Sequence, residues 1–217
     1  IDGAKNVILH FYNSTSTLQR KVVFHMEMDG IIKIATDAAK LIRELSEPVI
    51  AKGMNLRYEY SPESFSGTEM DNAALICQKV IETIGATPEN KIILNLPATV
   101  ERRPPNQYAD MIELFCRNYP YLSETAISIH AHNDQGCAVA ASELAVLAGA
   151  TRVEGTIFGH GERTGNLDLA VLALNLESRG VPTGLSFSDM PEIVRIVERN
   201  SGIEVHPRHP YAGDLAF

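Results

Sequence analysis

The chain has 217 residues, enough for one domain with a substantial core. Its 45% hydrophobic and 21% charged residues are those of an ordinary globular protein. The net charge of -8 comes without any cluster of Lys or Arg, which argues against a basic surface for nucleic acid or for an anionic membrane.

Apolar runs of strand length alternate with amphipathic stretches along the chain. Strands are expected at residues 6–12, 56–60, 91–95, 126–131 and 152–158. Helices are expected at residues 18–45, 68–84, 107–118, 136–148, 167–177 and 189–199. Because each strand is followed by a helix, the pattern predicts right-handed parallel βαβ units. Glu143 interrupts the apolar stretch 138–150, so no membrane span is expected.

Polar residues stand directly after each of the five expected strands, in NSTS, SPES, NLPATVE, HAHND and FGHGERTGN. Some of them, such as Ser16 and Asp134, could simply cap the next helix. Five polar strand ends in succession are typical of the catalytic face of a (β/α)8 barrel. A doubly wound sheet would often carry a glycine-rich phosphate loop after its first strand, and none is present here. The sequence therefore predicts an α/β fold of the TIM-barrel type.

The number of strands is too small for a complete barrel, which has eight. The chain opens on an isoleucine and reaches a core strand almost at once. We therefore expect an incomplete barrel of about five strands whose N-terminal strands are missing. Residues 1–180 would form the C-terminal part of the catalytic barrel. Residues 181–217, which begin rich in Pro, Gly and Ser, would be a linker and the start of a following helical subdomain.

Two histidines one residue apart, His130 and His132, close the fourth expected strand. Alternate residues of a strand point to the same side, so both imidazoles can reach one metal ion. A polar strand end that only satisfies hydrogen bonds is the alternative. From the pair alone, both interpretations stay open.

The segment HAHNDQG, followed by GATRVEGTIFGHGERTGN, resembles the DRE-TIM metallolyase superfamily. Within it, HFYNSTS, YSPESFSGTE and NLPATVE resemble the isopropylmalate synthases of the actinobacterial and fungal type, nearly from end to end. Those enzymes condense acetyl-CoA with 2-oxoisovalerate to give 2-isopropylmalate and CoA, toward leucine. The resemblance implies a divalent cation (Mg, Mn or Zn) as Lewis acid and acetyl-CoA as co-substrate. It further implies small-molecule substrates and a homodimer at full length.

The same resemblance assigns the metal ligands. They would be His130, His132 and Asn166, the last through its amide oxygen. On position alone Asn166 could instead be a helix N-cap. The family's remaining ligand, an Asp of the first barrel strand, is expected to have no counterpart in this chain.

Around the metal, the resemblance implies a substrate pocket. Thr99 would hydrogen-bond the carboxylate of the oxo acid, and Tyr12 would face its branched alkyl end. Glu63 would be an active-site carboxylate, with His10 next to the substrate. The remaining pocket residues would be Ser61, Asn95 and Pro97. On the residues alone, His10 and Tyr12 could be core aromatics, and Thr99 could begin a helix.

Several other polar residues receive structural interpretations. Glu69 is expected to be exposed in the first turn of a helix, where it complements the dipole. Glu162 and Arg163 could form an ion pair within their loop, and His206 and His209 would pack in the linker. The three cysteines lack the spacing of a metal site. They are expected to be small buried residues of a cytoplasmic protein: Cys77, Cys116 and Cys137.

Other functions remain as alternatives. Hydroxymethylglutaryl thioester lyases of the superfamily need a cysteine in the loop before the metal-binding Asn, and FGHGERTGN has none. Homocitrate synthase would need a cationic partner for its acidic oxo acid, whereas Tyr12 suggests an apolar pocket end. Amidohydrolase-type enzymes carry H-x-H on the first strand, not on a late one. A non-catalytic scaffold or binding fragment stays open for the chain as given.

Overall fold

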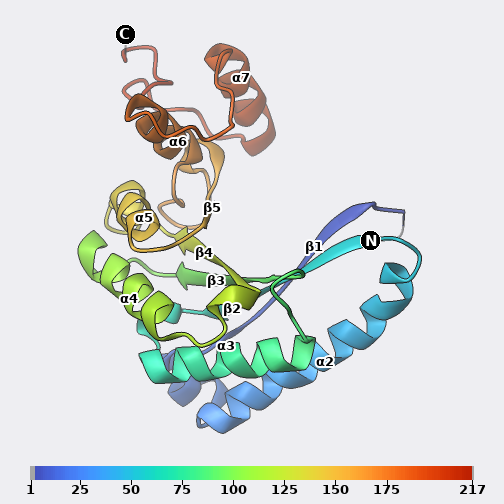
Figure 1. Cartoon of the computed structure of the whole chain (residues 1–217). Helices are drawn as coiled ribbons and strands as arrows, with labels where there is room; N and C mark the ends of the chain where they lie inside the picture. Colours follow the sequence, from blue (N-terminus) through green and yellow to red (C-terminus); the bar gives the residue numbers. More distant parts are fainter. Residues whose placement is uncertain (1–2, 217) are drawn as a thin grey trace.

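The computed structural model describes residues 3–216, so the expectation about how the chain begins concerns residues outside this range. Its centre is one parallel sheet in the order β1-β2-β3-β4-β5 (Figure 1). The strands are β1 (Asn6–Ser14), β2 (Asn55–Glu63), β3 (Ile92–Ala98), β4 (Thr125–Ala131) and β5 (Arg152–Glu154). Neighbours in sequence are neighbours in the sheet, as in a TIM barrel; a doubly wound sheet reverses its order. The predicted incomplete barrel is confirmed.

Helices between residues 28 and 147 cover one face of the sheet (Figure 1). All helices alternate with or follow the strands, as expected. They are α1 (Thr17–Gln19), the π-helix η1 (Arg20–Phe24), α2 (Met28–Ile50), α3 (Met70–Ile84), α4 (Pro105–Asn118), α5 (Ala138–Leu147), α6 (Leu169–Ser178) and α7 (Met190–Ser201). Single 3-10 turns lie at η2 (Phe65–Gly67), η3 (Leu122–Glu124) and η4 (Ile157–Gly159). Across residues 3–216, every helix is too short or too polar to cross a bilayer.

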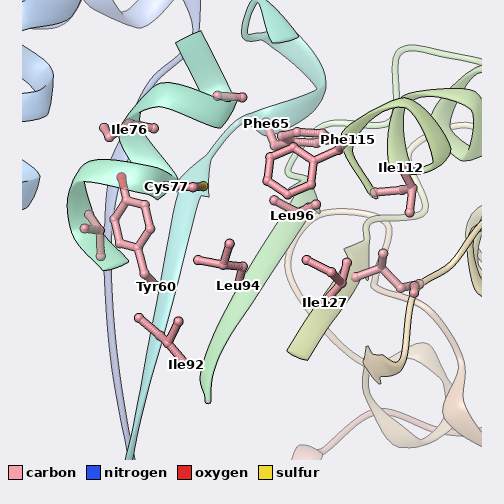
Figure 2. Packing of buried hydrophobic residues seen from close by; sticks show 14 of the residues in the cluster. Tyr60, Phe65, Ile76, Cys77, Ile92, Leu94, Leu96, Ile112, Phe115 and Ile127 are labelled. Atoms are coloured by element: carbon pink, nitrogen blue, oxygen red, sulfur yellow. The ribbon is translucent and has the colours of Figure 1, made fainter. Parts of the chain in front are cut away.

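The hydrophobic core lies between the sheet and these helices (Figure 2). Strands β3 and β4 contribute Leu94, Leu96 and Ile127, each at most 1% exposed. Phe65 meets Phe115 of α4 edge-on, with ring centroids 5.9 Å apart. Full burial of one such side chain contributes about 1.5–3 kcal/mol, so this face fixes the strands against the helices. The alternate residues of the strands must then face the other way.

The opposite face, which we call the open face, is polar toward the carboxyl ends of the strands. The register pairs His10 with Glu59 across β1 and β2, and His130 with Glu154 across β4 and β5. Toward the amino ends, the open face forms a hollow of about 660 Å³ lined by Asn6, Val7, Ile8, Asn55, Arg57, Ile93, Ala126 and Arg152. The predicted site residues therefore gather on one side of the sheet.

Two predicted elements were wrong in extent. The helix expected at 18–45 is broken, because His25 has a left-handed backbone (φ 51°) and α2 begins only at Met28. The strand expected at 152–158 ends at Glu154. There the chain turns to pair with residues 167–169, and a Cβ on Gly155 would lie 2.5 Å from the carbonyl oxygen of Leu167.

Candidate metal and substrate site

The two histidines of HAH lie side by side at the carboxyl end of β4. Their ring centroids are 5.1 Å apart. The Nδ2 atom of Asn166 lies 2.9 Å from His130 Nε2 and 3.4 Å from His132 Nε2. The backbone holds this arrangement, because His132 and Asn166 form an isolated β-bridge. The structure thus brings all three residues together; that they bind a metal stays a prediction.

Glycines of the loop FGHGERTGN let Asn166 reach this position. A Cβ on Gly161 would overlap the Asn166 side chain, and Gly165 has φ 97°. The interpretation of Asn166 as a helix cap is wrong, because Asp168 caps α6. The Oδ1 atom of Asp168 accepts from the backbone N–H groups of Ala170 (2.9 Å) and Val171 (3.1 Å).

The donor set at this point suits a divalent cation. Imidazole nitrogens and an amide oxygen are ligands for Zn or Mn, and a rotation of the Asn166 amide would present its oxygen. Within the described part of the chain, no group of three or more His, Cys, Asp and Glu side chains is arranged to hold a metal. A cation held by His130, His132 and Asn166 would therefore need further ligands beyond these three side chains.

A buried polar network under His130 escaped the sequence analysis. Glu154 Oε2 lies 3.4 Å from His130 Nδ1, and the same carboxylate accepts hydrogen bonds from Ser128 (2.9 Å) and Asn95 (3.1 Å). The Arg152 guanidinium contacts Glu154 and lies 3.6 Å from Glu59 on β2. The alternation of Arg and Glu in RVE was the available signal, because it places both charges on one face of β5.

The two carboxyl groups of this network have opposite protonation behaviour. Burial raises the pKa of Glu59 to about 8, and its hydrogen bond with Glu154 and the charge of Glu154 add to the shift. Although burial alone would raise the pKa of Glu154, hydrogen bonds from His130, Glu59 and Ser128 lower it to about 2. These surroundings favour the neutral form of Glu59 and the charged form of Glu154.

His10 and Ser61 meet on the same face, at β1 and β2. His10 Nε2 lies 2.8 Å from Ser61 Oγ and 3.7 Å from Glu59 Oε1. Burial lowers the pKa of His10, which favours a neutral ring. The Tyr12 ring, 5.9 Å from that of His10, is 66% exposed, so the interpretation of the two as core aromatics is wrong.

Glu63 and Thr99 are held at the ends of β2 and β3. The hydroxyl of Ser14 donates to Glu63 Oε2 at 2.7 Å. The backbone N–H of Ser64 donates to Thr99 Oγ1 at 2.9 Å, which leaves the Thr99 hydroxyl hydrogen free for another acceptor. Pro97, two residues before Thr99, pairs in register with His130.

Arg163 ties the loop before Asn166 to the strand ends. Its guanidinium donates to Asp134 at 2.8 and 3.0 Å, to the carbonyl oxygen of Thr99 at 2.6 Å and to His132 Nδ1 at 3.0 Å. Hydrogen bonds from Arg163 lower the pKa of Asp134 to about 2. Glu162 lies 3.8 Å from Arg163, so the expected ion pair is secondary to the contact with Asp134.

The helix-capping interpretation holds for Ser16 but fails for Asp134. Ser16 Oγ accepts from the backbone N–H of Gln19 at 3.3 Å. Asp134 instead accepts from the backbone N–H of Glu101 at 2.9 Å. In return, the buried Glu101 carboxylate accepts from the backbone N–H groups of Gln135 and Cys137. This exchange joins the loops after β3 and β4, and the sequence analysis missed it.

Two of the structural interpretations were incomplete. Glu69 precedes α3 as expected, but it also binds the buried Arg20 at 2.5 and 2.6 Å. A hydrogen bond to its own backbone, together with the contact to Arg20, lowers its pKa to about 2. Among the cysteines, Cys77 is fully buried, whereas Cys116 and Cys137 are half-buried.

Hydrogen bonds and ion pairs connect much of the site. Arg163 links His132 to Thr99, and the Glu59–Glu154 pair links His10 to His130. Within the residues that the structure describes, no hydrogen bond joins Tyr12 or Glu63 to the two histidines. Those two residues lie at the margin of the network, further along β1 and β2.

The family model described as HMGL-like matches residues 2–197. The chain is 52% identical over 217 residues to 2-isopropylmalate synthase of Rhodospirillum rubrum, and spans 39% of that protein. It is 53% identical over 217 residues to 2-isopropylmalate synthase of Kocuria rhizophila, and spans 37% of it. The chain thus covers about two fifths of these curated relatives, and the predicted resemblance to isopropylmalate synthases is confirmed.

Solved structures agree with this fold. The HMG-CoA lyase of Bacillus subtilis superposes with a TM-score of 0.67 at 16% identity, covering 94% of this chain and 65% of the lyase. The HMG-CoA lyase of Acinetobacter baumannii, in complex with coenzyme A and 3-methylmalate, gives 0.67 at 15% identity, covering 97% and 67%. At 15–16% identity, this structural similarity shows only a shared fold. With its parallel sheet and the family match over residues 2–197, the chain belongs to the HMGL-like family.

Proposed function

We propose that the protein condenses acetyl-CoA with 2-oxoisovalerate and that water then hydrolyses the thioester, which gives 2-isopropylmalate and free CoA. One observation carries the proposal: His130, His132 and Asn166 converge at a strand end beside Thr99, in a chain about half identical to 2-isopropylmalate synthases. Residues 1–180 would be the barrel part of the enzyme and residues 181–217 the linker, and the enzyme would act in the cytoplasm as a homodimer at its natural length.

The metal-binding part of the proposal concerns three side chains. His130 and His132 would hold a divalent cation (Mg, Mn or Zn) through Nε2, and Asn166 would hold it through the amide oxygen. When bound, the cation would act as a Lewis acid that polarises the keto group of the oxo acid. The His130 side chain is 29% exposed, so the site would be accessible to that substrate from this side.

Thr99 would orient the oxo acid. Its oxygen already accepts from Ser64, so the hydroxyl hydrogen can donate to the substrate carboxylate. Asn95 and Pro97 precede Thr99 along the same strand and would form the pocket wall. The exposed ring of Tyr12 would face the branched alkyl end of the substrate.

His10, Ser61 and Glu63 would serve acetyl-CoA, whose methyl group must lose a proton before it attacks the keto carbon. The His10–Ser61 pair can hydrogen-bond the thioester oxygen and so stabilise the enolate. Glu63, fixed by Ser14, is a carboxylate able to accept a proton. This assignment rests on their position around the open face and on their residue types.

The direct test measures CoA release by the protein at its natural length, with acetyl-CoA and a panel of oxo acids. We expect turnover with 2-oxoisovalerate that a chelator abolishes and that His132→Gln removes. His206→Gln is the matched control, because His206 lies in the C-terminal segment and should leave turnover unchanged. Turnover with 2-oxoglutarate instead would indicate homocitrate synthesis, and cleavage of hydroxymethylglutaryl-CoA would indicate a lyase; either result contradicts the proposal.

A further inference from the structure

Glu154 stands directly opposite His130 in the sheet, and no role for it follows from the reaction proposed above. The two residues are partners in the β4–β5 register, with Glu154 Oε2 3.4 Å from His130 Nδ1. The Glu154 side chain is 19% exposed, in a network that draws on four strands. The hydrogen-bond partner of Nδ1 determines whether the Nε2 atom of a neutral histidine carries a hydrogen or a free lone pair.

Besides Glu59, three groups bonded to Glu154 are hydrogen-bond donors. Asn95 donates through Nδ2 at 3.1 Å, Ser128 through its hydroxyl at 2.9 Å, and Arg152 through its guanidinium. A carboxylate surrounded in this way acts only as an acceptor. His130 can therefore make a favourable contact with it only when Nδ1 carries a hydrogen.

We propose that Glu154 is a positioning residue, which holds His130 in the Nδ1–H tautomer and so directs the Nε2 lone pair toward the site shared with His132 and Asn166. The proposal rests on the proposed function, in which Nε2 is a metal ligand. A neutral imidazole with its hydrogen on Nδ1 has a free lone pair on Nε2. Carboxylate partners of this kind orient metal-binding histidines and raise their basicity.

His132 offers a contrast inside the same site. Its Nδ1 lies 3.0 Å from the Arg163 guanidinium, which is a donor, and Glu154 makes no hydrogen bond to it among the described residues. The two histidines thus have opposite kinds of partner on Nδ1. In the conformation described, Arg163 favours the Nε2–H tautomer of His132, so binding of a cation through His132 Nε2 would require this contact to open. A change at Glu154 should act on the tautomer of His130 and leave that of His132 unaltered.

The test uses the protein at its natural length, labelled with ¹⁵N-histidine and free of metal. The ¹⁵N shifts of His130, assigned by comparison with His130→Gln, report its tautomer. We expect Nδ1–H for His130 in the wild type and a mixture of tautomers in Glu154→Gln. Titration with Mn²⁺ then measures affinity, which should fall about 10- to 100-fold in Glu154→Gln. Glu143→Gln, which changes a carboxylate paired with Arg179 on the helical side, is the matched control.

Each outcome decides the matter. If the ¹⁵N shifts of the wild type place the hydrogen of His130 on Nε2, the proposal is overturned. This measurement uses the wild type and so does not depend on the folding of a variant. Unchanged shifts and unchanged Mn²⁺ affinity in a folded Glu154→Gln protein overturn it as well. If the wild type binds no Mn²⁺ but shows the Nδ1–H tautomer and its loss in Glu154→Gln, the positioning role stands and the proposed metal function fails.

Discussion

At the scale of single residues, two carboxyl groups on one face of the sheet show how strongly position decides charge. Glu59 and Glu154 face the same guanidinium, that of Arg152. Burial raises the pKa of Glu59 to about 8, while Glu154, with more donors around it, has its pKa lowered to about 2. Neither shift could be predicted from the sequence, because each depends on which strands are paired and in which register.

The raised pKa of Glu59 predicts a pH-dependent effect on stability. Between about pH 4.5 and 8 the unfolded chain loses this proton and the folded protein keeps it, so Glu59 lowers stability progressively as the pH rises. We compare the free energy of unfolding of Glu59→Gln with that of the wild type at each pH. This difference should shift in favour of the variant by about 1–3 kcal/mol between pH 5 and pH 8.5, because one pKa unit corresponds to about 1.4 kcal/mol. Chemical denaturation at the two pH values measures the difference, with Glu44→Gln on the exposed side of α2 as the control. An equal effect at both values would contradict the account.

Thr99 gives the clearest prediction for substrate binding. Thr99→Ala should raise the KM for 2-oxoisovalerate or lower kcat, at a cost of about 1.5–3 kcal/mol for a hydrogen bond to a charged group. The KM for acetyl-CoA should change little, and Thr99→Ser should restore most of the loss. Steady-state kinetics with each substrate varied in turn provide the measurement. An unchanged profile for the oxo acid would remove Thr99 from the site.

At the scale of elements, the loops after β3 and β4 are joined by Glu101, a residue that no sequence pattern singled out. The buried carboxylate accepts from the backbone N–H groups of Gln135 and Cys137 just before α5. Glu101→Ala should leave these donors without partners and destabilise the fold by about 1–3 kcal/mol. Denaturant unfolding tests this, with Glu101→Gln, which keeps one acceptor oxygen, expected to lose less. Equal losses in the two variants would show that the hydrogen bonds are not the cause.

Two side-chain contacts anchor the C-terminal segment: the Tyr211 hydroxyl donates to Asn175 Oδ1 of α6 at 2.7 Å, and His209 pairs with Asp168. His209 Nε2 lies 2.5 Å from Asp168 Oδ2, while the other oxygen of Asp168 caps α6. His209→Ala should speed amide hydrogen exchange in residues 202–216 and leave α6 protected. His206→Ala, in the same segment but without that contact, is the control. Loss of protection throughout the sheet would mean that the pair supports more than this segment.

The strands could be predicted because buried parallel strands are continuous apolar runs, and all five were located within a few residues. The helical stretch at 18–45 could not be divided correctly, because the left-handed turn at His25 leaves no mark in the apolar periodicity. The pairing of His130 and His132 followed from their spacing alone. Glu154 and Arg152 were missed because charges in a short strand look solvent-exposed until the neighbouring strand is known.

At the scale of the whole molecule, the sheet of residues 3–216 is an open arc. Each of β1 and β5 pairs with one neighbouring strand, and Ile8 on the open face is 50% exposed. Unpaired strand edges and exposed apolar side chains promote association. We therefore expect residues 1–217, purified alone, to self-associate and to release no CoA from acetyl-CoA and 2-oxoisovalerate with Mg²⁺ or Mn²⁺. Clear turnover by a monodisperse preparation would show that these strands suffice for activity.

The central claim is that His130, His132 and Asn166 hold the cation to which the oxo acid binds. Anomalous scattering from Mn²⁺, in crystals of the protein at its natural length grown with 2-oxoisovalerate, tests this most directly. The account predicts one strong peak at about 2.0–2.3 Å from the Nε2 atoms of both histidines. Electron density for the oxo acid should lie between this peak and the Thr99 hydroxyl. A fully occupied peak elsewhere, with the two imidazoles bound only to protein groups, would contradict it.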